Sequence, residues 1–299
     1  MAQTVLVTGS NSGFGRLTVE TLARQGYIVL AAMRAINGRN TTAAQELREF
    51  AERERAVVHP IEVDITDDAS VEQAIPAAVA ITGRLDVVFN NAGTSAFGPL
   101  EAFSSEQAQS LFATNVLSVL RLNRAAVPFM RQQGSGLLIQ VGSIIGRVAV
   151  PFLGLYGATK FALEGITESY RRELAPFGID AAIIEPGTFP TAIARNRQLA
   201  ADTERLGLYQ TAIDAFTTPF FAATRSVTPP NPQDVADGVA RLIAMPAGTR
   251  PLRVVVATAE QSAAPQALND ANEQAAHSFY TALGLPIEPL ACQAPSGER

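Results

Sequence analysis

The sequence predicts an α/β protein with a single Rossmann-like, doubly wound parallel sheet of seven strands and helices on both faces. Apolar runs alternate with helical segments along the chain, and the first run ends in a glycine-rich turn. The runs are rich in Val, Ile, Leu and Ala, as is typical of parallel strands buried on both faces. The expected strands are 4–7, 27–33, 56–63, 85–89, 136–141, 179–184 and 252–256.

Helices are expected between these strands, at 14–25, 43–55, 67–81, 106–131, 156–174 and 234–245. Residues 188–232 contain no expected strand, and loops of that length in compact domains are usually functional, so this segment is interpreted as a lid. Residues 1–258 then form one Rossmann-type domain that includes the lid. The tail, 259–299, carries one amphipathic helix at 264–283 and belongs to the same domain or to an oligomer contact. From residue 286 onward it is expected to be loosely structured.

Composition narrows the class of protein. The 299 residues are 47% hydrophobic and 17% charged, with a net charge of −5 and no dense run of basic residues, which argues against a nucleic-acid surface. The one cysteine, Cys292, cannot form an internal disulfide, and no apolar run approaches the roughly 20 residues of a membrane span. With no basic leader at the start, a cytoplasmic location is expected. His59 and His277 lack neighbours at ligand spacing, so no metal site is expected.

The glycine-rich turn follows the first strand as T-G-S-N-S-G-F-G, with Gly9, Gly13 and Gly15. Glycines permit a tight strand-to-helix turn and let backbone approach a pyrophosphate closely. The following helix offers free N–H groups and the positive end of its dipole. The spacing differs from GxGxxG, and a turn without a ligand is the alternative interpretation.

The spacing resembles the TGxxxGxG signature of the short-chain dehydrogenase/reductase family. The N-N-A-G sequence at 90–93 is similar to that family's NNAG motif, and Asn115, Ser143, Tyr156 with Lys160, and Pro186-Gly187 follow in the family's order over nearly the whole chain. One position departs from the pattern, since Gly142 stands where the family usually has a serine. The resemblance implies cofactor contacts from Gly9, Ser12, Gly13, Phe14, Gly15, Asp64, Ile65, Asn91, Ala92, Gly93, Tyr156, Lys160, Pro186, Gly187 and Thr191.

The expected catalytic residues are Asn115, Ser143, Tyr156 and Lys160. Tyr156 and Lys160 are four positions apart, which places both on one helix face, and an ammonium group lowers a phenol's pKa toward the range of proton transfer. Ser143 follows a strand end and can hydrogen-bond a substrate carbonyl oxygen. The resemblance implies that Lys160 holds the nicotinamide ribose and that Asn115 distorts its helix and positions a water; a plain core hydrogen bond is the alternative for Asn115. Asn91 either contacts cofactor or braces the sheet.

The residues after the second strand predict the cofactor NADP(H). Enzymes that use NAD usually carry an acidic residue there, which binds the ribose 2′-hydroxyl and repels a 2′-phosphate. Met33 occupies that place, and Arg34 follows, with Arg39 close behind. A guanidinium binds phosphate through paired charge-assisted hydrogen bonds. Asp64 is expected at the adenine instead.

The expected substrate site is apolar, with Phe97, Ser143, Phe152, Leu153 and Phe189, and with further lid phenylalanines at 216, 220 and 221. This favours a hydrophobic ketone or secondary alcohol, such as an aryl ketone, a terpenoid or a steroid-like ring. The predicted function is an NADP(H)-dependent carbonyl reductase or secondary-alcohol dehydrogenase.

Three other functions compete with this prediction. A catalytically silent NADP(H)-binding regulator of the same fold is the main alternative. A sugar-nucleotide epimerase would resemble a GxxGxxG pattern, and a serine hydrolase would need a GxSxG elbow, which the residues after Ser143 do not form. Relatives pair the equivalents of helices 106–131 and 156–174 to form dimers, so a homodimer or homotetramer is expected, unless both helix faces are buried within one subunit.

Overall fold

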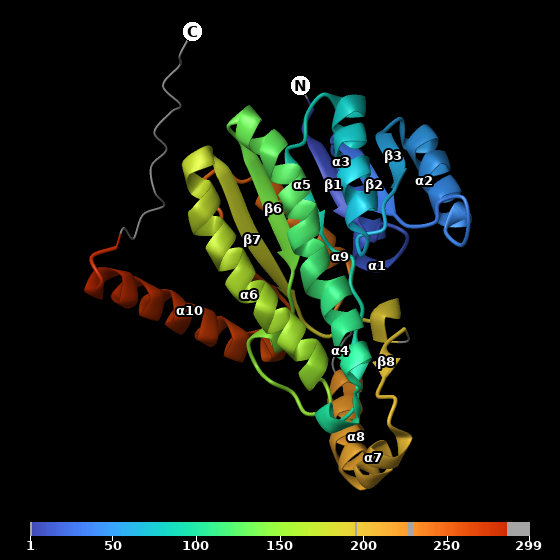
Figure 1. Cartoon of the computed structure of the whole chain (residues 1–299), viewed down its shortest axis with the longest axis vertical. Coiled ribbons are helices and arrows are strands. Elements are labelled where there is room, and N and C mark those ends of the chain that lie inside the picture. The colour runs from blue at the N-terminus through green and yellow to red at the C-terminus, as the bar shows by residue number, and fades with distance from the viewer. Residues whose placement is uncertain (1, 195, 227–229, 286–299) are drawn as a thin grey trace.

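The computed structural model describes residues 2–194, 196–226 and 230–285, and it confirms the doubly wound fold (Figure 1). The main sheet has seven parallel strands in the order β3-β2-β1-β4-β6-β7-β9. The order reverses between β1 and β4, so ligands are expected at the carboxyl ends there. The strands are β1 (Thr4–Thr8), β2 (Ile28–Met33), β3 (Val57–Glu62), β4 (Val87–Asn90), β6 (Gly136–Val141), β7 (Ile179–Pro186) and β9 (Arg253–Val256).

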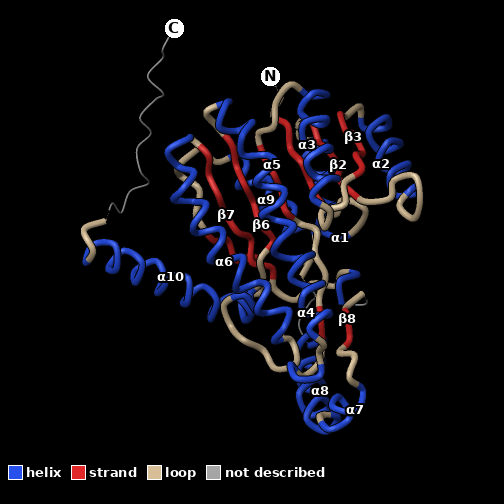
Figure 2. The backbone as a smooth tube through the Cα atoms, in the orientation of Figure 1, coloured by secondary structure: helices blue, strands red, loops and turns tan. Residues whose placement is uncertain are grey.

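Helices cover both faces of the sheet (Figure 2). On one face lie α1 (Gly13–Arg24), α2 (Thr41–Glu54) and α9 (Gln233–Ala244), and their apolar residues form one core with the sheet. On the other face lie α3 (Asp68–Thr82), α5 (Ser118–Gln133) and α6 (Gly154–Leu174), which form a second core. Strand residues alternate between the two cores, because successive side chains of a strand point to opposite faces.

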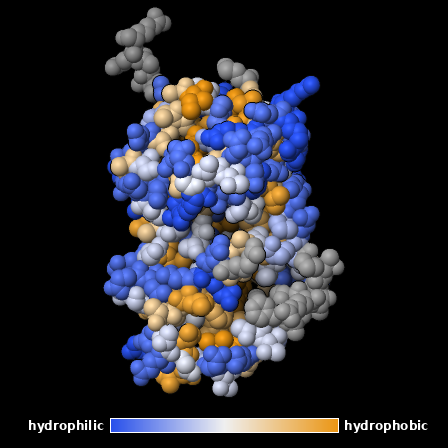
Figure 3. Space-filling view, turned by 90° about the vertical axis from the view of Figure 1, so that its right-hand side faces the viewer, coloured by the Kyte–Doolittle hydropathy of each residue, from blue (hydrophilic) through white to orange (hydrophobic). Residues whose placement is uncertain are grey.

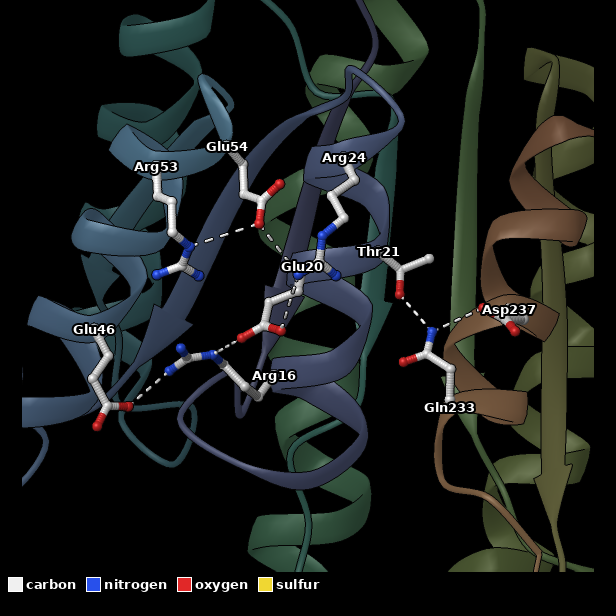
Figure 4. A network of polar contacts seen from close by, with 9 residues as sticks. All are labelled: Arg16, Glu20, Thr21, Arg24, Glu46, Arg53, Glu54, Gln233 and Asp237. Carbon is white, nitrogen blue, oxygen red and sulfur yellow. Dashed lines mark hydrogen bonds and ion pairs between the residues drawn. The ribbon is translucent and has the colours of Figure 1, made fainter.

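Polar contacts tie α1 to its neighbours (Figure 4). Arg16 on α1 bonds Glu20 at 2.5 Å and Glu46 of α2 at 3.1 Å. On the other side of α1, the Gln233 amide donates to Thr21 at 2.7 Å. The charge of Arg16 is therefore engaged by two carboxylates, although Arg16 lies only one residue beyond the glycine turn.

The long helix expected at 106–131 is interrupted. It consists of α4 (Ser105–Phe112), a π-helical turn (Ala113–Leu117) and α5. A π-turn inserts one extra residue into the helical ladder, and such turns occur frequently at functional sites. Periodicity did not reveal the interruption, but the family resemblance implied that Asn115, at its centre, distorts the helix.

The prediction that residues 188–232 contain no strand is wrong. Short strand β8 (Gln198–Leu199) pairs in parallel with β5 (Ala96–Phe97), outside the main sheet. Gln107 of α4 fixes this pairing, because its amide donates to the Leu199 carbonyl at 2.8 Å and accepts from the Ala201 N–H at 3.0 Å. Two residues are too short for a periodic signal, so only the partner strand defines β8. The helices α7 (Thr203–Leu208) and α8 (Gln210–Ser226) complete the lid.

The tail helix α10 (Ala259–Ala282) begins five residues earlier than the expected 264, and it runs away from the sheet past the α6 side of the molecule (Figure 1). Its buried residues are Pro265 and Asn269. The segment from 286, with Cys292, lies outside the described residues. Across the described part of the chain, no helix combines the length and apolar character needed to cross a membrane.

Candidate active site

The glycine turn has the shape that a dinucleotide requires. Gly9 and Gly13 adopt positive φ of 65° and 56°, where residues with a side chain are strained. A Cβ on Gly15 would lie 2.4 Å from the Gly9 carbonyl oxygen, so α1 can approach the turn this closely only with glycine there. Ser12 is the N-cap residue of α1, and its carbonyl accepts from the Arg16 N–H.

The sequence 90–93 braces this turn. The Asn91 amide nitrogen donates to the Thr8 carbonyl at 2.8 Å, and the backbone N–H groups of Asn91 and Ala92 both donate to the Thr8 hydroxyl at 3.0 Å. Of the two roles considered for Asn91, the structure shows the bracing one. Gly93 lies against Asn115, since a Cβ on it would be 3.2 Å from the Asn115 side-chain oxygen.

Two exposed guanidinium groups follow β2. Arg34 and Arg39 lie near Asp64, and both charges contribute to lowering the pKa of that carboxyl, although its hydrogen bonds with Thr66 contribute most. The Asn40 amide holds the intervening turn by donating to the Arg34 carbonyl at 2.6 Å. Among the described residues neither arginine forms an ion pair, in contrast to Arg16. Ile65 follows Asp64 and is partly buried.

Met33 does not face this region, because its side chain is 3% exposed and packs in the core. An acidic side chain introduced at this position would therefore be buried. The side chain that does emerge beyond the strand end belongs to Arg34.

Asn115 occupies the π-helical turn and is 2% exposed. Its side-chain oxygen accepts from the Thr94 N–H at 2.9 Å, while its nitrogen donates to the Thr94 carbonyl at 2.8 Å and to the Thr159 hydroxyl at 3.1 Å. Asn115 thus ties the segment after β4 to α6, one residue before Lys160.

Ser143, Tyr156 and Lys160 come together at the carboxyl end of β6. Ser143 follows that strand, and its hydroxyl is close enough to Tyr156 to influence the pKa of the phenol. The Lys160 ammonium group donates to the Val141 carbonyl at 2.7 Å and lies 5.6 Å from the centre of the Tyr156 ring. Two chain segments, the end of β6 and helix α6, therefore supply a hydroxyl, a phenol and an ammonium group to one site.

Burial controls the titration of this group. Burial raises the pKa of Tyr156 well above its usual value, and the hydrogen bond with Ser143 opposes the rise. Burial lowers the pKa of Lys160 to about 8, and the negative charge of Glu164 opposes that fall. Burial thus works against the predicted lowering of the Tyr156 pKa by Lys160, because removing the phenolate from water disfavours it.

The departure at Gly142 has a packing explanation. A Cβ there would lie 2.8 Å from the Ile183 side chain, so Ile183 fills the space that a serine would need. Pro186 at the end of β7 offers its carbonyl oxygen 3.5 Å from the Ser143 hydroxyl.

The neighbouring Gly187 reveals a residue that the sequence did not single out. Gln261 of α10 accepts from the Thr188 N–H at 2.9 Å, directly beside Gly187. Gln261 follows Gly187 by 74 positions, and nothing in the local sequence links the two.

Aromatic side chains lie close together around Phe152, which follows Ser143 in the chain. Phe152, with a strained φ of +63°, lies 6.2 Å from Phe97, 6.5 Å from Tyr209 and 5.7 Å from Phe216, measured between ring centres. Leu153 is the N-cap residue of α6 next to Phe152. Figure 3 shows hydrophobic surface within a hollow between the main body and the lower projection of the molecule.

The structure does not place Phe189 with this group. Phe189 packs edge-on against Phe14 of α1 at 5.3 Å and belongs to the core of the α1 face, and Thr191 lies in the same loop, with its N–H donating to the Phe189 carbonyl at 2.9 Å. The side chains of Phe220 and Phe221 lie outside the described residues. No cluster of three potential metal ligands occurs in the described part of the chain.

Comparison with known proteins agrees with this geometry. The short chain dehydrogenase family model matches residues 3–202. A 3-ketodihydrosphingosine reductase of Bacteroides thetaiotaomicron is 35% identical over 198 residues, which cover 66% of this chain and 68% of the relative. Retinol dehydrogenase 8 of Homo sapiens is 32% identical over 258 residues, covering 83% and 79%. The solved structure of a short-chain dehydrogenase from Streptomyces avermitilis superposes with a TM-score of 0.71 at 26% identity, covering 95% and 97%. The chain belongs to the short-chain dehydrogenase/reductase family, nicotinamide-dependent oxidoreductases that act on CH–OH groups.

Proposed function

We propose that the protein is an NADP(H)-dependent carbonyl reductase or secondary-alcohol dehydrogenase for bulky apolar substrates. The observation that carries the proposal is the convergence of Ser143, Tyr156 and Lys160 at the end of β6, close to a glycine turn that would admit a dinucleotide. A reductase needs a proton donor, a carbonyl-binding group and a hydride source within one site.

The residues fit a dinucleotide. The turn from Gly9 to Gly15 would hold the pyrophosphate at the N-terminus of α1, since a side chain on Gly15 would fill the space that the turn keeps free. Ser12, Phe14, Asp64, Ile65, Ala92, Gly93, Pro186, Gly187 and Thr191 complete the proposed cofactor site. When bound, the nicotinamide supplies or accepts the hydride.

The protein residues would handle the proton and the carbonyl oxygen. The raised pKa of Tyr156 keeps its phenol protonated at neutral pH, and reduction requires the protonated form. Ser143 and Tyr156 would both donate to the substrate oxygen as negative charge develops on it. Lys160 would stabilise the phenolate that remains after proton transfer, and Asn115 would hold the adjoining turn of α6.

The preference for NADP(H) rests on Arg34 and Arg39. Both are exposed beside the glycine turn and neither is engaged in an ion pair among the described residues, so both guanidinium groups are available to a 2′-phosphate. The turn that holds them is linked to the glycine segment, since the Asn11 amide donates to Asn40 at 3.4 Å.

The substrate class rests on the aromatic group of Phe97, Phe152, Tyr209 and Phe216. These rings come from three separate segments and meet around Phe152, four residues before Tyr156, as expected for an apolar pocket with a few polar anchors. The two curated relatives above are named for a lipid ketone and a lipid alcohol, which supports a bulky, neutral substrate. Phe189 is better explained as a wall of the cofactor site, because it packs on Phe14.

A homodimer or homotetramer is part of the proposal, as is a cytoplasmic location. Leu117 at the end of the π-helical turn, Leu120 on α5 and Phe161 on α6 are 43%, 37% and 43% exposed, and a second subunit would cover them.

The direct test is steady-state reduction of a ketone panel with NADPH and with NADH. We expect bulky neutral ketones to be reduced with much higher kcat/KM than small charged keto acids. Binding of NADPH without turnover of any ketone or alcohol would instead favour the silent regulator.

A further inference from the structure

A buried carboxyl pair lies one helical turn behind Lys160. Glu164 follows Lys160 by four positions on α6, and Glu185 reaches it from β7, next to Pro186. Their side chains are among the least accessible of the chain, at 4% and 0% exposure. Carboxyl groups this deeply buried are costly unless each is paired or protonated.

The partners of the two carboxyl groups account for only half of their oxygens. Arg253 of β9 donates its Nε to Glu164 Oε2 at 2.8 Å, and it also donates to Glu168 at 2.9 Å. Asn269 of α10 donates to Glu185 Oε2 at 2.7 Å. The remaining oxygens, Glu164 Oε1 and Glu185 Oε1, are buried and receive no donor from the described residues.

A shared proton completes this arrangement. The carboxyl groups of Glu164 and Glu185 are close enough to act on each other, and two carboxyl groups can share a hydrogen bond only when one of them carries a proton. Burial raises the pKa of Glu185 to about 8, and the negative charge of Glu164 adds to the rise. Burial therefore favours the protonated form of Glu185 at neutral pH.

Charged and polar groups from each element packed on the Glu164–Glu185 pair surround it. Helix α6 contributes Lys160 and Glu168, β9 contributes Arg253, and Arg147 after the 3₁₀ turn Ile144–Gly146 lies near Glu185. Helix α10 contributes the amides of Asn269 and Asn272. The negative charge of Glu164 acts on Lys160, whose own hydrogen bond goes to the Val141 carbonyl.

We propose that Glu164 is a positioning residue for the active site: its carboxylate, which shares a single proton with Glu185, keeps the buried Lys160 in its ammonium form. The inference rests on the proposed roles of Tyr156 and Lys160. Without Glu164, burial alone would favour neutral Lys160, and a neutral amine could not stabilise a phenolate. The shared proton matters because a second negative charge would be added next to Glu164 if Glu185 were ionised.

The sequence makes a direct test possible, because Lys160 is its only lysine. Protein labelled with ¹³C at lysine Cε gives a single lysine side-chain signal, whose chemical shift is followed from pH 6 to 11 by NMR. In Glu164→Gln we expect the Lys160 midpoint to fall by at least about 0.5 pH unit, because a nearby opposite charge is removed. The alkaline limb of kcat/KM for ketone reduction should move down by a similar amount.

Two matched variants isolate the effect. Glu168→Gln removes the other carboxylate bound by Arg253, one turn further from Lys160, and should leave the midpoint within about 0.2 unit of wild type, since charge effects weaken with distance. Glu185→Gln replaces the protonated carboxyl with an amide that can also donate to Glu164, so it too should leave the midpoint nearly unchanged. If Glu164→Gln does not fold, Glu164→Leu supplies a neutral side chain without a polar group to bury.

The outcomes separate the inference from the proposed function. An unchanged Lys160 midpoint in folded Glu164→Gln or Glu164→Leu would overturn the role of Glu164. A fall in Glu185→Gln as large as that in Glu164→Gln would overturn the shared proton. If wild-type protein reduced no ketone, the proposed function would fail, while the NMR titration would still report on Glu164 and Lys160.

Discussion

Tyr156 and Lys160 lie one turn apart on α6, with the ammonium nitrogen 5.6 Å from the centre of the phenol ring. Because burial keeps Tyr156 protonated, the geometry is ready for proton donation to a carbonyl oxygen. Tyr156→Phe removes that proton and keeps the ring. We expect kcat for ketone reduction to fall by at least about 100-fold with little change in NADPH affinity, since proton transfer belongs to the transition state.

Tyr280→Phe is the matched control, because Tyr280 lies on α10 and its ring packs against Arg172 at 4.1 Å rather than against a group of the active site. It should keep kcat within about threefold, as expected when no transition-state interaction is removed. A Tyr156→Phe enzyme that retained more than about a tenth of the wild-type rate would show that Tyr156 is not the proton donor.

The cofactor preference should depend on Arg34 and Arg39. We expect wild type to favour NADPH over NADH by at least about tenfold in kcat/KM, because a phosphate–arginine contact exceeds about 1.4 kcal/mol. The double variant Arg34→Ala/Arg39→Ala should lose most of that preference while its activity with NADH changes little. Arg48→Ala, on the far half of α2, serves as the control. Equal use of both cofactors by wild type would contradict this assignment.

The converse substitution, Met33→Asp, tests a different property. Met33 is buried in the core, so an aspartate there should lower the free energy of unfolding by several kcal/mol through burial of an unpaired carboxylate, and that loss would obscure any change of cofactor. The thermal unfolding midpoint of Met33→Asp, with Met33→Leu as control, measures it. A variant with unchanged stability would show that the side chain can turn outward.

Gly15→Ala should weaken cofactor binding. The new Cβ would lie 2.4 Å from the Gly9 carbonyl oxygen and 2.5 Å from the Asn91 amide, so the turn must move. We expect the NADPH dissociation constant, measured by fluorescence titration, to rise by at least about tenfold, the equivalent of 1.4 kcal/mol. Gly165→Ala on α6 adds the same methyl group where nothing lies within 4 Å, and its affinity should stay that of wild type.

Burial of the Lys160 ammonium group should make stability depend on pH. The folded pKa of about 8 is below the usual 10.5, so the unfolded chain binds more protons between these values, and stability rises as pH increases from about 8 to 10.5. Lys160→Met should lack that rise. At pH 7 its free energy of unfolding should exceed that of wild type by about 2 kcal/mol, so it should unfold at a higher temperature. Calorimetry from pH 7 to 10.5 compares the two proteins.

The contribution of Glu185 to stability changes with pH in the opposite direction to that of Lys160, and over a lower pH range. Its folded pKa of about 8 is above the usual 4.5, so its contribution to stability is lost as pH rises from about 4.5 to 8. A wild-type stability curve that stayed flat above pH 8 would contradict the burial of a charged Lys160.

The sequence predicted the backbone fold of this protein much better than it predicted contacts between side chains. The alternation of apolar runs and helices was sufficient for the seven-stranded sheet, and the order of glycine turn, Ser143, Tyr156 and Lys160 was sufficient for the family, because strand ends in a parallel sheet meet at one edge. The interruption at Asn115 was implied by the resemblance to the family, which rests on the same ordered motifs. These features depend on local sequence, and local sequence reports them.

Contacts between distant segments were decided only by the tertiary structure. Strand β8 exists because β5 and Gln107 lie beside it, Phe189 joined Phe14 rather than the other phenylalanines, and Gln261 reached Thr188 from the tail helix. Glu164 belongs to the same class, since four-residue spacing from Lys160 is common on exposed helices. Glu164 has a proposed role because it is buried against Glu185 and Arg253. A charge removed from water interacts more strongly with the groups around it.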